Sequence, residues 1–486
     1  MSSVLVFSVI AGYFLLLIFI SYLTGRKSNT ASFFTANRKS PWYLVAFGMI
    51  GASLSGVTFI SVPGEVGNSY FYYFQFVLGY LPGYLVIALV LLPIYYKLNL
   101  VSIYTYLDNR FGGRAYITGS AFFLLSRVLG ASFRLFLVAG VLQIGFFDAF
   151  DIPFYVTVPV TIALIWIYTY RAGIKTIVFT DTLQTLFMVS AVIITIIIVG
   201  KELNIQASEI IETVRQSEHS KVFDWRWRSE TNFFKQFFAG AFIAIVMTGL
   251  DQDMMQKNLT CKTLRDSQKN MFWFTLTLIP VNLLFLSLGA LLYVYAAQSG
   301  ITLPESSDEL YPILALNHFS VFAGIAFLLG ITAAAFSSAD SALTSLTTAF
   351  SVDFLKLDIN SEGEEVKRKK RYVHLGFSAL LFAVIMIFNS LSDESVVNSV
   401  FRVASYTYGP LLGLFAFGIF TKLKAKDNAI PYIAVISPVL AYLLNLHSEA
   451  LLWGYKFGFE LLIVNGAITF IGLLLFSTRK GKLLRV

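Results

Sequence analysis

The chain has 486 residues, of which 57% are hydrophobic and 13% charged, and its formal net charge is +8. Soluble globular domains carry about 25% charged residues, so the composition excludes an ordinary soluble protein. The basic residues flank long apolar runs, as the positive-inside rule predicts for membrane proteins, which excludes a nucleic-acid-binding surface. The single cysteine, Cys261, excludes an internal disulfide framework.

The apolar runs and their polar breaks predict an all-α membrane protein with about 13 transmembrane helices, because each run is long enough to cross a bilayer core of about 30 Å. The first run lacks the basic start and the cleavage site of a signal peptide and is predicted to be a retained helix. The predicted spans lie near 3–24, 41–64, 70–96, 115–146, 153–170, 177–199, 232–252, 272–297, 318–350, 371–391, 397–421, 428–446 and 455–477.

Lysine and arginine are concentrated in the connections on one side of these spans. Loops that face the cytoplasm carry such an excess of basic residues. We therefore expect a multi-pass protein of the cytoplasmic (inner) membrane, with its N-terminus outside and its C-terminus in the cytoplasm. The basic connections are 25–40, 97–114, 171–176, 253–271, 351–371, 422–427 and the C-terminal tail.

The second span contains a polar, glycine-rich stretch from Gly48 to Thr58, with three glycines and three hydroxyl side chains, and ends in Pro63-Gly64. Glycine weakens a helix, and unwound carbonyls at mid-membrane can coordinate a sodium ion. Close helix packing through small residues explains the same pattern equally well. The stretch therefore leaves an ion site and a packing site as alternatives.

The ninth span carries a row of serines, in which Ser337, Ser341 and Ser345 recur every four residues beside Asp340. Residues four apart lie on one face of a helix, so a line of hydroxyls is predicted there. Such a row favours an ion site, although serines also bond back to their own helix.

An acidic residue, Asp181, lies in the first turns of the sixth span. A carboxylate inside a membrane needs a cation or hydroxyl partners to stay ionised. The alternative is a solvated residue at the cytoplasmic start of the helix.

The fourth span contains Arg127 and Arg134, which are seven residues apart and therefore share one helix face. A buried arginine stays charged and needs an anion, so one of the two is a candidate for binding a substrate carboxylate. The alternative is an internal ion pair or a side chain that reaches the membrane interface.

Several stretches of the chain together resemble the sodium/solute symporter family, which includes sodium-coupled transporters of sugars, proline, iodide, monocarboxylates and sialic acid. The resemblance covers nearly the whole chain, and its combination of motifs is specific, although Lys257 stands where the family has arginine. The matching stretches are Gly51–Gly64, Pro93–Phe111, Gly173–Gln184, Asp251–Lys257, Ala334–Leu343 and Tyr408–Gly413.

The resemblance implies a leucine-transporter-like fold of two inverted five-helix repeats within one transmembrane domain, 1–486. The repeats would span 41–199 and 232–421, with one extra N-terminal helix and two extra C-terminal helices in 422–486. It also implies sodium as the coupling ion. The main sodium site would use Gly51, Leu54, Ala334, Ser337 and Ser338, and a second site would use Asp181, Ser337, Asp340 and Ser341.

The substrate implied by the resemblance is a small organic solute, and the buried arginines favour an anion such as sialic acid or another carboxylate. The alternatives are a proton-coupled symporter, a channel, or a sensory protein on the same helical body. The sequence does not indicate an oligomeric state, and no enzyme motif is present. The implied substrate contacts are Ser53, Ser55, Thr58, Tyr73, Gln75, Arg127 and Arg134.

Overall fold

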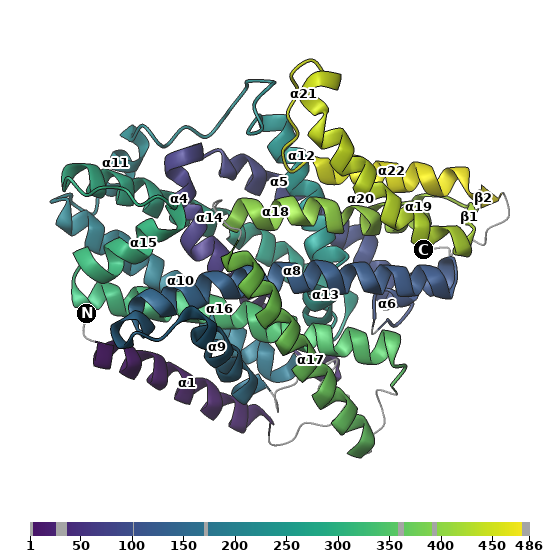
Figure 1. The fold of residues 1–486 in the computed structure, drawn as a ribbon, viewed down its shortest axis with the longest axis horizontal. Helices are drawn as coiled ribbons and strands as arrows, with labels where there is room; N and C mark the ends of the chain where they lie inside the picture. Colours follow the sequence, from purple (N-terminus) through teal and green to yellow (C-terminus); the bar gives the residue numbers. More distant parts are fainter. Residues whose placement is uncertain are drawn as a thin grey trace.

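The computed structural model describes residues 3–25, 36–100, 102–169, 174–357, 364–390 and 396–478. Helices make up nearly all of the regular structure in these residues (Figure 1), which confirms the predicted all-α class. The one sheet among them is a short antiparallel ladder of β1 (Lys424–Ala425) and β2 (Ser477–Thr478), in which Lys424 pairs with Thr478. Parts of the predicted basic connections, including 26–35, 358–363 and 479–486, lie outside the described residues.

Within the described residues, seven helices are long and apolar enough to cross a membrane, and the number rises to ten if each of three bent helix pairs counts as one span. Three shorter apolar helices accompany them. Every predicted span coincides with one of these elements, and the number of crossings stays a prediction.

The first predicted repeat begins with a broken helix, in which α3 (Trp42–Ser53) and α4 (Gly56–Ser69) meet at an angle of 54°. The next span is α5 joined to α6 through a π-helical turn. The remaining elements of this repeat are α5 (Tyr73–Val86), α6 (Leu92–Lys97), α7 (Thr105–Arg110), α8 (Gly113–Gly145), α9 (Phe154–Thr169) and α10 (Ile174–Glu202).

The second predicted repeat also begins with a break, because α12 (Phe233–Ala244) and its π-helical turn bend by 71° into α13 (Gln252–Asn258). Its last span is broken as well, with a bend of 47° between α18 and α19. The further elements are α14 (Leu264–Gln298), α15 (Leu310–Ile313), α16 (Val321–Ala349), α17 (Glu364–Asn389), α18 (Val396–Thr407) and α19 (Gly409–Phe420).

Helices outside the two repeats cover their flanks. The first helix, α1 (Ser3–Gly25), packs against α10 and α16, and the C-terminal α20 (Ile430–Leu446) and α22 (Leu461–Leu475) pack against α19. Two short helices, α11 (Ile210–Gln216) and α21 (Ser448–Leu451), lie in connections.

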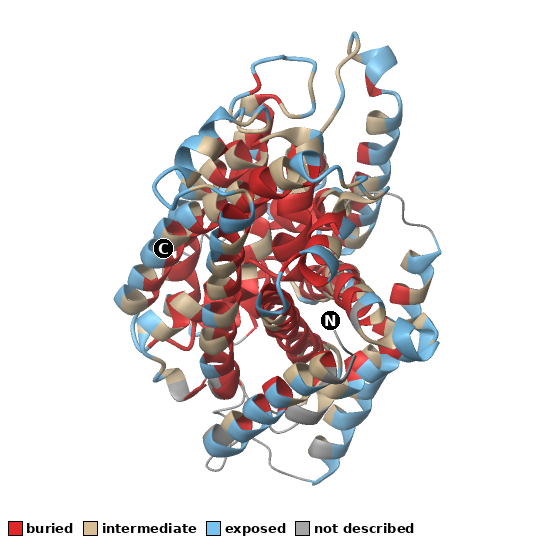
Figure 2. Ribbon diagram, turned by 90° about the vertical axis from the view of Figure 1, so that its left-hand side faces the viewer, coloured by how far each residue is buried: buried red, intermediate tan, exposed pale blue. Residues whose placement is uncertain are grey.

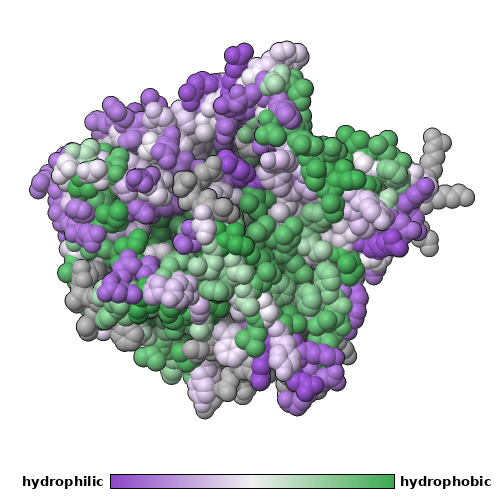
Figure 3. Space-filling model, in the orientation of Figure 1, coloured by the Kyte–Doolittle hydropathy of each residue, from purple (hydrophilic) through white to green (hydrophobic). Residues whose placement is uncertain are grey.

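The helix α16 forms the centre of the molecule. In its most apolar stretch of 18 residues 78% is buried, whereas the same measure is 28% for the peripheral α20. Buried residues fill the interior in Figure 2, and exposed ones lie on the outer helices. Large apolar side chains such as Leu15, Phe19 and Val435 are exposed on those helices. Figure 3 shows apolar side chains over much of one face, which is the surface expected to contact lipid.

Candidate functional site

The break between α3 and α4 lies in the predicted glycine-rich stretch. Leu54 ends α3 with φ −84° and ψ 28°, and Ser55 precedes α4 with φ −26° and ψ 176°. Both residues are buried. A helix end leaves carbonyl oxygens of its last turn without partners from the same helix, so the break turns backbone oxygens near Gly51 and Leu54 into candidate ligands.

The glycines of this stretch also allow close packing, as the packing interpretation of the sequence pattern predicts. A β-carbon on Gly48 would lie 3.1 Å from the β-carbon of Asp181 on α10. A β-carbon on Gly56 would lie 3.8 Å from the α-carbon of Ala335 on α16. The broken helix therefore lies directly against the two helices that carry the other predicted ion ligands.

The serine row of α16 is buried along its whole length. Ser338 donates a hydrogen bond to the carbonyl of Ala334 (3.2 Å) and Ser345 to that of Ala342 (3.0 Å), which are the back-bonds expected of helical serines. Ser337 instead donates to the Oδ1 atom of Asp181 at 2.8 Å. The Oγ atom of Ser341 is buried and has no hydrogen-bond partner among the described residues.

Asp181 is fully buried and is not a solvated helix-start residue. Its Oδ2 atom lies 2.7 Å from the Nζ atom of Lys257 on α13, and the lysine side chain is itself only 1% exposed. The sequence predicted a bound cation or hydroxyl partners for Asp181. The structure shows the hydroxyl of Ser337 as one partner and, as a second partner that the sequence did not predict, the ammonium of Lys257. The fourth member of the predicted second site, Asp340, is buried on α16 between these serines.

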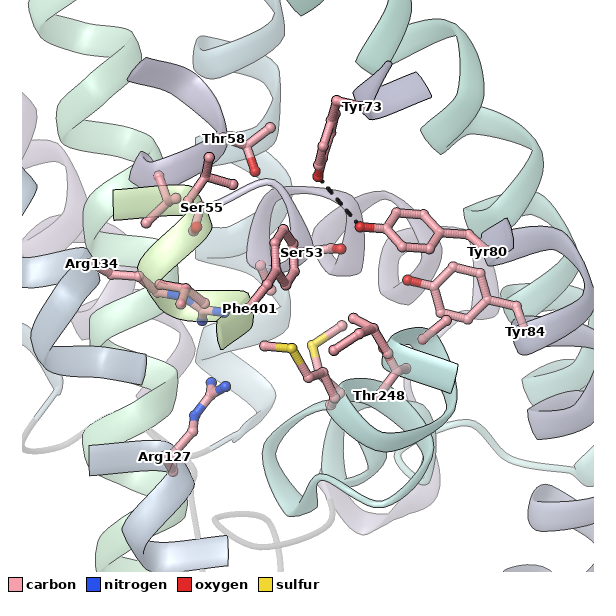
Figure 4. A pocket seen from close by; sticks show the side chains of 18 residues that line it. Ser53, Ser55, Thr58, Tyr73, Tyr80, Tyr84, Arg127, Arg134, Thr248 and Phe401 are labelled. Atoms are coloured by element: carbon pink, nitrogen blue, oxygen red, sulfur yellow. Dashed lines mark hydrogen bonds between the residues drawn. The ribbon is translucent and has the colours of Figure 1, made fainter. Parts of the chain in front are cut away.

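A partly open cavity lies beside the break (Figure 4). Ser53 and Ser55 border it from the break, Thr58 from α4, and Tyr73 from α5. These four predicted substrate contacts thus meet at one site. Figure 4 shows them around a common space, with Arg127 and Arg134 reaching it from α8.

The two arginines have different surroundings. The guanidinium of Arg127 forms an ion pair with Asp253, and its Nη1 atom is 3.7 Å from Asp251, which also accepts a 2.7 Å hydrogen bond from Tyr408. The Nε atom of Arg134 is buried without a hydrogen-bond partner, and no described acidic residue forms an ion pair with this side chain. Arg134 is therefore the arginine left available for an anion.

The structure does not bring Gln75 to the cavity wall. Its Nε2 atom donates to the carbonyl of Thr231 (2.9 Å), and its Oε1 atom accepts from the backbone N–H of Asp224 (3.0 Å). Both ends of the amide are thus used to hold the connection between α10 and α12.

Sequence reasoning missed much of the cavity wall. Tyr80 and Tyr84 follow the predicted contact Tyr73 at intervals of seven and four residues, a helical spacing that could have indicated a shared face. The hydroxyls of Tyr73 and Tyr80 are 3.4 Å apart. Thr248, Met247 and Met254 come from the second broken helix and Phe401 from α18, and only tertiary structure places these residues here.

The described residues contain no cluster of three or more His, Cys, Asp or Glu side chains that could hold a metal ion. The candidate ion ligands are instead the carbonyls near the break and the hydroxyls of Ser337 and Ser338. Neutral oxygens of this kind suit a monovalent cation that has to be released again.

Comparison with known proteins relates the chain to membrane transporters. The family model described as the sodium:solute symporter family matches residues 33–430. The chain is 25% identical over 451 residues to a sodium/sialic acid symporter of Proteus mirabilis, covering 90% of this chain and 88% of the relative. It is also 25% identical to a sodium/sialic acid symporter of Aliivibrio fischeri, covering 86% and 83%.

Solved structures agree on the fold. A sodium-coupled sialic acid symporter in a substrate-bound, outward-open state matches with a TM-score of 0.81 and 20% identity, covering 97% of both chains. A nucleobase-cation-symport-1 family transporter in a closed conformation matches with a TM-score of 0.56 and 13% identity, covering 91% of this chain and 93% of that one. The predicted transporter fold is thereby confirmed.

Proposed function

The chain belongs to the sodium:solute symporter family, and we propose that it imports a small organic anion together with sodium by alternating access. The observation that carries this proposal is the juxtaposition of three features: a broken helix, a buried serine row and a cavity with an available arginine.

The main sodium site in this proposal consists of the carbonyls of Gly51, Leu54 and Ala334 and the hydroxyls of Ser337 and Ser338. The hydroxyl hydrogens of the two serines point to other acceptors, Asp181 and the carbonyl of Ala334. Their oxygen lone pairs therefore remain available for a cation. Five oxygens from two helices would surround the ion, so its binding depends on how the two helices are arranged.

Sodium can drive transport only if it binds one conformation more tightly than another. We propose that it holds the α3–α4 break against α16 in the outward-facing state, which completes the substrate cavity beside the break. An inward-negative membrane potential adds about 2.3 kcal/mol per charge for every 100 mV. Neutral ligands allow the ion to leave once the helices separate on the cytoplasmic side.

The substrate in this proposal is an organic anion, such as sialic acid or another carboxylate. Arg134 supplies a planar donor for a carboxylate, and the hydroxyls of Ser53, Ser55, Thr58 and Tyr73 supply hydrogen bonds. Arg127 contributes to the cavity wall, and its charge is already balanced by Asp253 and Asp251. The sialic acid symporters among the relatives support this substrate class.

The proposed location is the cytoplasmic membrane, with the N-terminus outside and the C-terminus in the cytoplasm. The distribution of basic connections supports this orientation. In Figure 1 the first turns of α1 lie at the left of the molecule and β2 lies at the right, in agreement with ends on opposite sides. Accessibility of a protease site added at either end of the chain, measured in sealed right-side-out vesicles, tests the orientation.

Uptake into proteoliposomes tests the function. Purified protein is supplied with labelled N-acetylneuraminic acid, lactate, proline or glucose under an inward gradient of sodium or of choline. We expect uptake of an acid, dependent on sodium, enhanced by an inside-negative potential and insensitive to a protonophore. Uptake that follows a proton gradient and ignores sodium would instead support the proton-coupled alternative, and ion conductance without solute accumulation would support a channel.

A further inference from the structure

The break between α18 and α19 has a local cause, a proline. In an α-helix the carbonyl of each residue accepts a hydrogen bond from the N–H group four residues later. The carbonyl of Tyr406 would therefore pair with residue 410, which is proline and has no N–H group. Pro410 stands in the first turn of α19, and the two helices meet there at an angle of 47°. The break thus leaves the carbonyl of Tyr406 without a helical partner.

A side chain from outside the two predicted repeats supplies the missing donor. The Nδ2 atom of Asn465, on α22, donates to the carbonyls of Tyr406 (2.8 Å) and Ser405 (3.0 Å). Asn465 is fully buried, and carbonyl oxygens can only accept, so the NH2 end of its amide has to face them. A β-carbon on Gly409 would collide with this amide, so the glycine leaves the space that Asn465 fills. Asn465 therefore caps the break.

Capping by a distant side chain also occurs at the break between α12 and α13. The hydroxyl of Tyr95 donates to the carbonyl of Gly249 (2.8 Å), and the hydroxyl of Tyr104 donates to that of Leu250 (2.9 Å). A buried carbonyl without a donor is costly, so these bonds stabilise the bend in the conformation that the structure shows. Two of the three bent helix pairs are thus held by donors from other parts of the chain.

The cap on α18 lies close to the part of this helix that borders the cavity. Val397, Val400 and Phe401 of α18 line the cavity wall. The ring of Phe401 packs against Phe459, which shortly precedes α22, with 5.2 Å between the ring centroids. The hydroxyl of Ser405 also donates to the carbonyl of Phe459 (3.3 Å). The start of α22 thus contacts α18 both at the break and beside the cavity.

We infer that Asn465 is a positioning residue for the substrate: by capping the break it fixes the angle of α18, and so the place of Phe401 on the cavity wall. Asn465 does not itself line the cavity. The inference rests on the proposed function. It gives the extra C-terminal helices, which lie outside both predicted repeats, a part in substrate affinity.

Uptake kinetics at saturating sodium test this role. Asn465→Leu nearly keeps the side-chain volume and removes both donors. We expect its KM for N-acetylneuraminic acid, or for lactate if the wild type accumulates that acid instead, to rise about fivefold or more, because small displacements of positioning groups are costly. Binding of ²²Na⁺ without substrate should stay within about twofold of the wild type, since α18 and α19 carry no proposed sodium ligand. A residue that only stabilises the fold would lower the maximal rate and leave KM unchanged.

The matched control is Thr469→Val, one turn further along α22. The hydroxyl of Thr469 is buried and bonds to Ser437 (2.6 Å) and to the carbonyl of Asn465 (3.1 Å), so its loss perturbs α22 and keeps both donors at the break. The KM of this variant should equal that of the wild type. Phe401→Ala gives a second comparison, because residues that act through one another have non-additive effects. In that background Asn465→Leu should raise KM by less than about twofold.

Unfolding measurements test the cap without any substrate. Pro410→Ala restores an N–H group at position 410, so the carbonyl of Tyr406 regains a helical donor. The fall in unfolding temperature caused by Asn465→Leu should therefore be smaller in the Pro410→Ala background than in the wild type. If Asn465→Leu does not fold, Asn465→Ser, which keeps one donor, takes its place and should raise KM about threefold or more.

An unchanged KM in Asn465→Leu, or in Asn465→Ser in its place, would overturn the inference, as would an equal rise of KM in Thr469→Val. A full rise of KM in the Phe401→Ala background would show that Asn465 does not act through Phe401. Equal falls in unfolding temperature in the two backgrounds would refute the cap. A wild type that accumulates neither acid in a sodium gradient would contradict the proposed function itself, and the unfolding measurements would still decide the cap.

Discussion

A β-carbon placed on Gly51 would lie 2.2 Å from the Oγ1 atom of Thr185, so α3 and α10 meet at a point with no room for a side chain. The threonine hydroxyl is fixed by hydrogen bonds to the carbonyls of Asp181 (2.7 Å) and Phe47 (3.0 Å). The helix that breaks at Leu54 is thus held against the helix that carries Asp181. A proposed sodium ligand and its supporting residues depend on this contact.

Gly51→Ala should therefore weaken sodium binding, because the new methyl group pushes the end of α3 away from α10. We expect the sodium concentration for half-maximal uptake to rise at least tenfold. Adding Thr185→Ala removes the obstructing hydroxyl and should restore part of the affinity. Gly140→Ala is the control, because a β-carbon there would meet nothing within 4 Å. Equal sodium dependence in Gly51→Ala and Gly140→Ala would refute the role of this contact.

The two arginines of α8 should respond differently to the same substitution. Arg134→Gln removes the available guanidinium, so we expect the KM for the anionic substrate to rise 10- to 100-fold with little change in unfolding temperature. Arg127→Gln leaves Asp253 and Asp251 buried without their partner, which costs about 3–5 kcal/mol of stability when a buried pair is broken. Uptake kinetics and thermal unfolding of both variants separate the two effects. An unchanged KM in Arg134→Gln would exclude this arginine from the substrate site.

Gln75 and Thr58 offer a second comparison, because both were predicted to contact substrate and only Thr58 lines the cavity. Gln75→Ala should lower stability by about 1–3 kcal/mol, the cost of leaving buried polar groups unsatisfied, and leave KM unchanged. Thr58→Val keeps the shape of the side chain and removes the hydroxyl, so KM should rise with little loss of stability. A raised KM with unchanged stability in Gln75→Ala would instead place Gln75 in the substrate site.

The broken helix could be predicted because its cause is local: Gly51 and Gly56 weaken the chain where they stand. The ion pair between Asp181 and Lys257 joins residues 76 positions apart, and helical periodicity contains no information about such a pair. The same limit applies to the arginines. Arg127 and Arg134 share a face in sequence, and only the fold places Asp253 beside one of them.

Some residues of the cavity wall could likewise be predicted from the sequence, and others could not. Ser53, Ser55 and Thr58 could be proposed because polar side chains are costly within an apolar span. Phe401 and Met254 are ordinary residues of apolar segments, and their sequence neighbours do not distinguish a cavity wall from a packed core. Gln75 was predicted to contact the substrate because it is polar. Its amide group instead forms hydrogen bonds with the backbone of Asp224 and Thr231 in the connection between α10 and α12.

Stability should depend on pH through Asp224 in that connection. Burial alone would raise the pKa of Asp224, but hydrogen bonds from Arg226, Thr231 and Ser229 lower the pKa well below its ordinary value. A carboxyl with a lowered pKa in the folded state stabilises the protein above its unfolded pKa of about 3.9, and this stability is lost as the pH falls through the folded pKa.

The unfolding temperature should therefore be insensitive to Asp224 titration between pH 8 and about pH 5 and should fall below about pH 4. Asp224→Asn should be less stable than the wild type at neutral pH and should lose less stability on acidification. Thermal unfolding of both proteins across this range measures the difference. Parallel profiles for the two proteins would rule out this contribution.

The most direct test of the sodium site is the sodium dependence of uptake in Ser338→Ala. The matched control is Ser345→Ala, since Ser345 lies on the same helix and its hydroxyl bonds only to its own backbone among the contacts described. We predict sodium-dependent uptake in the wild type and the control, and at least a tenfold rise in the half-saturating sodium concentration in Ser338→Ala. Uptake that ignores external sodium and is unaffected by Ser338→Ala would contradict the account.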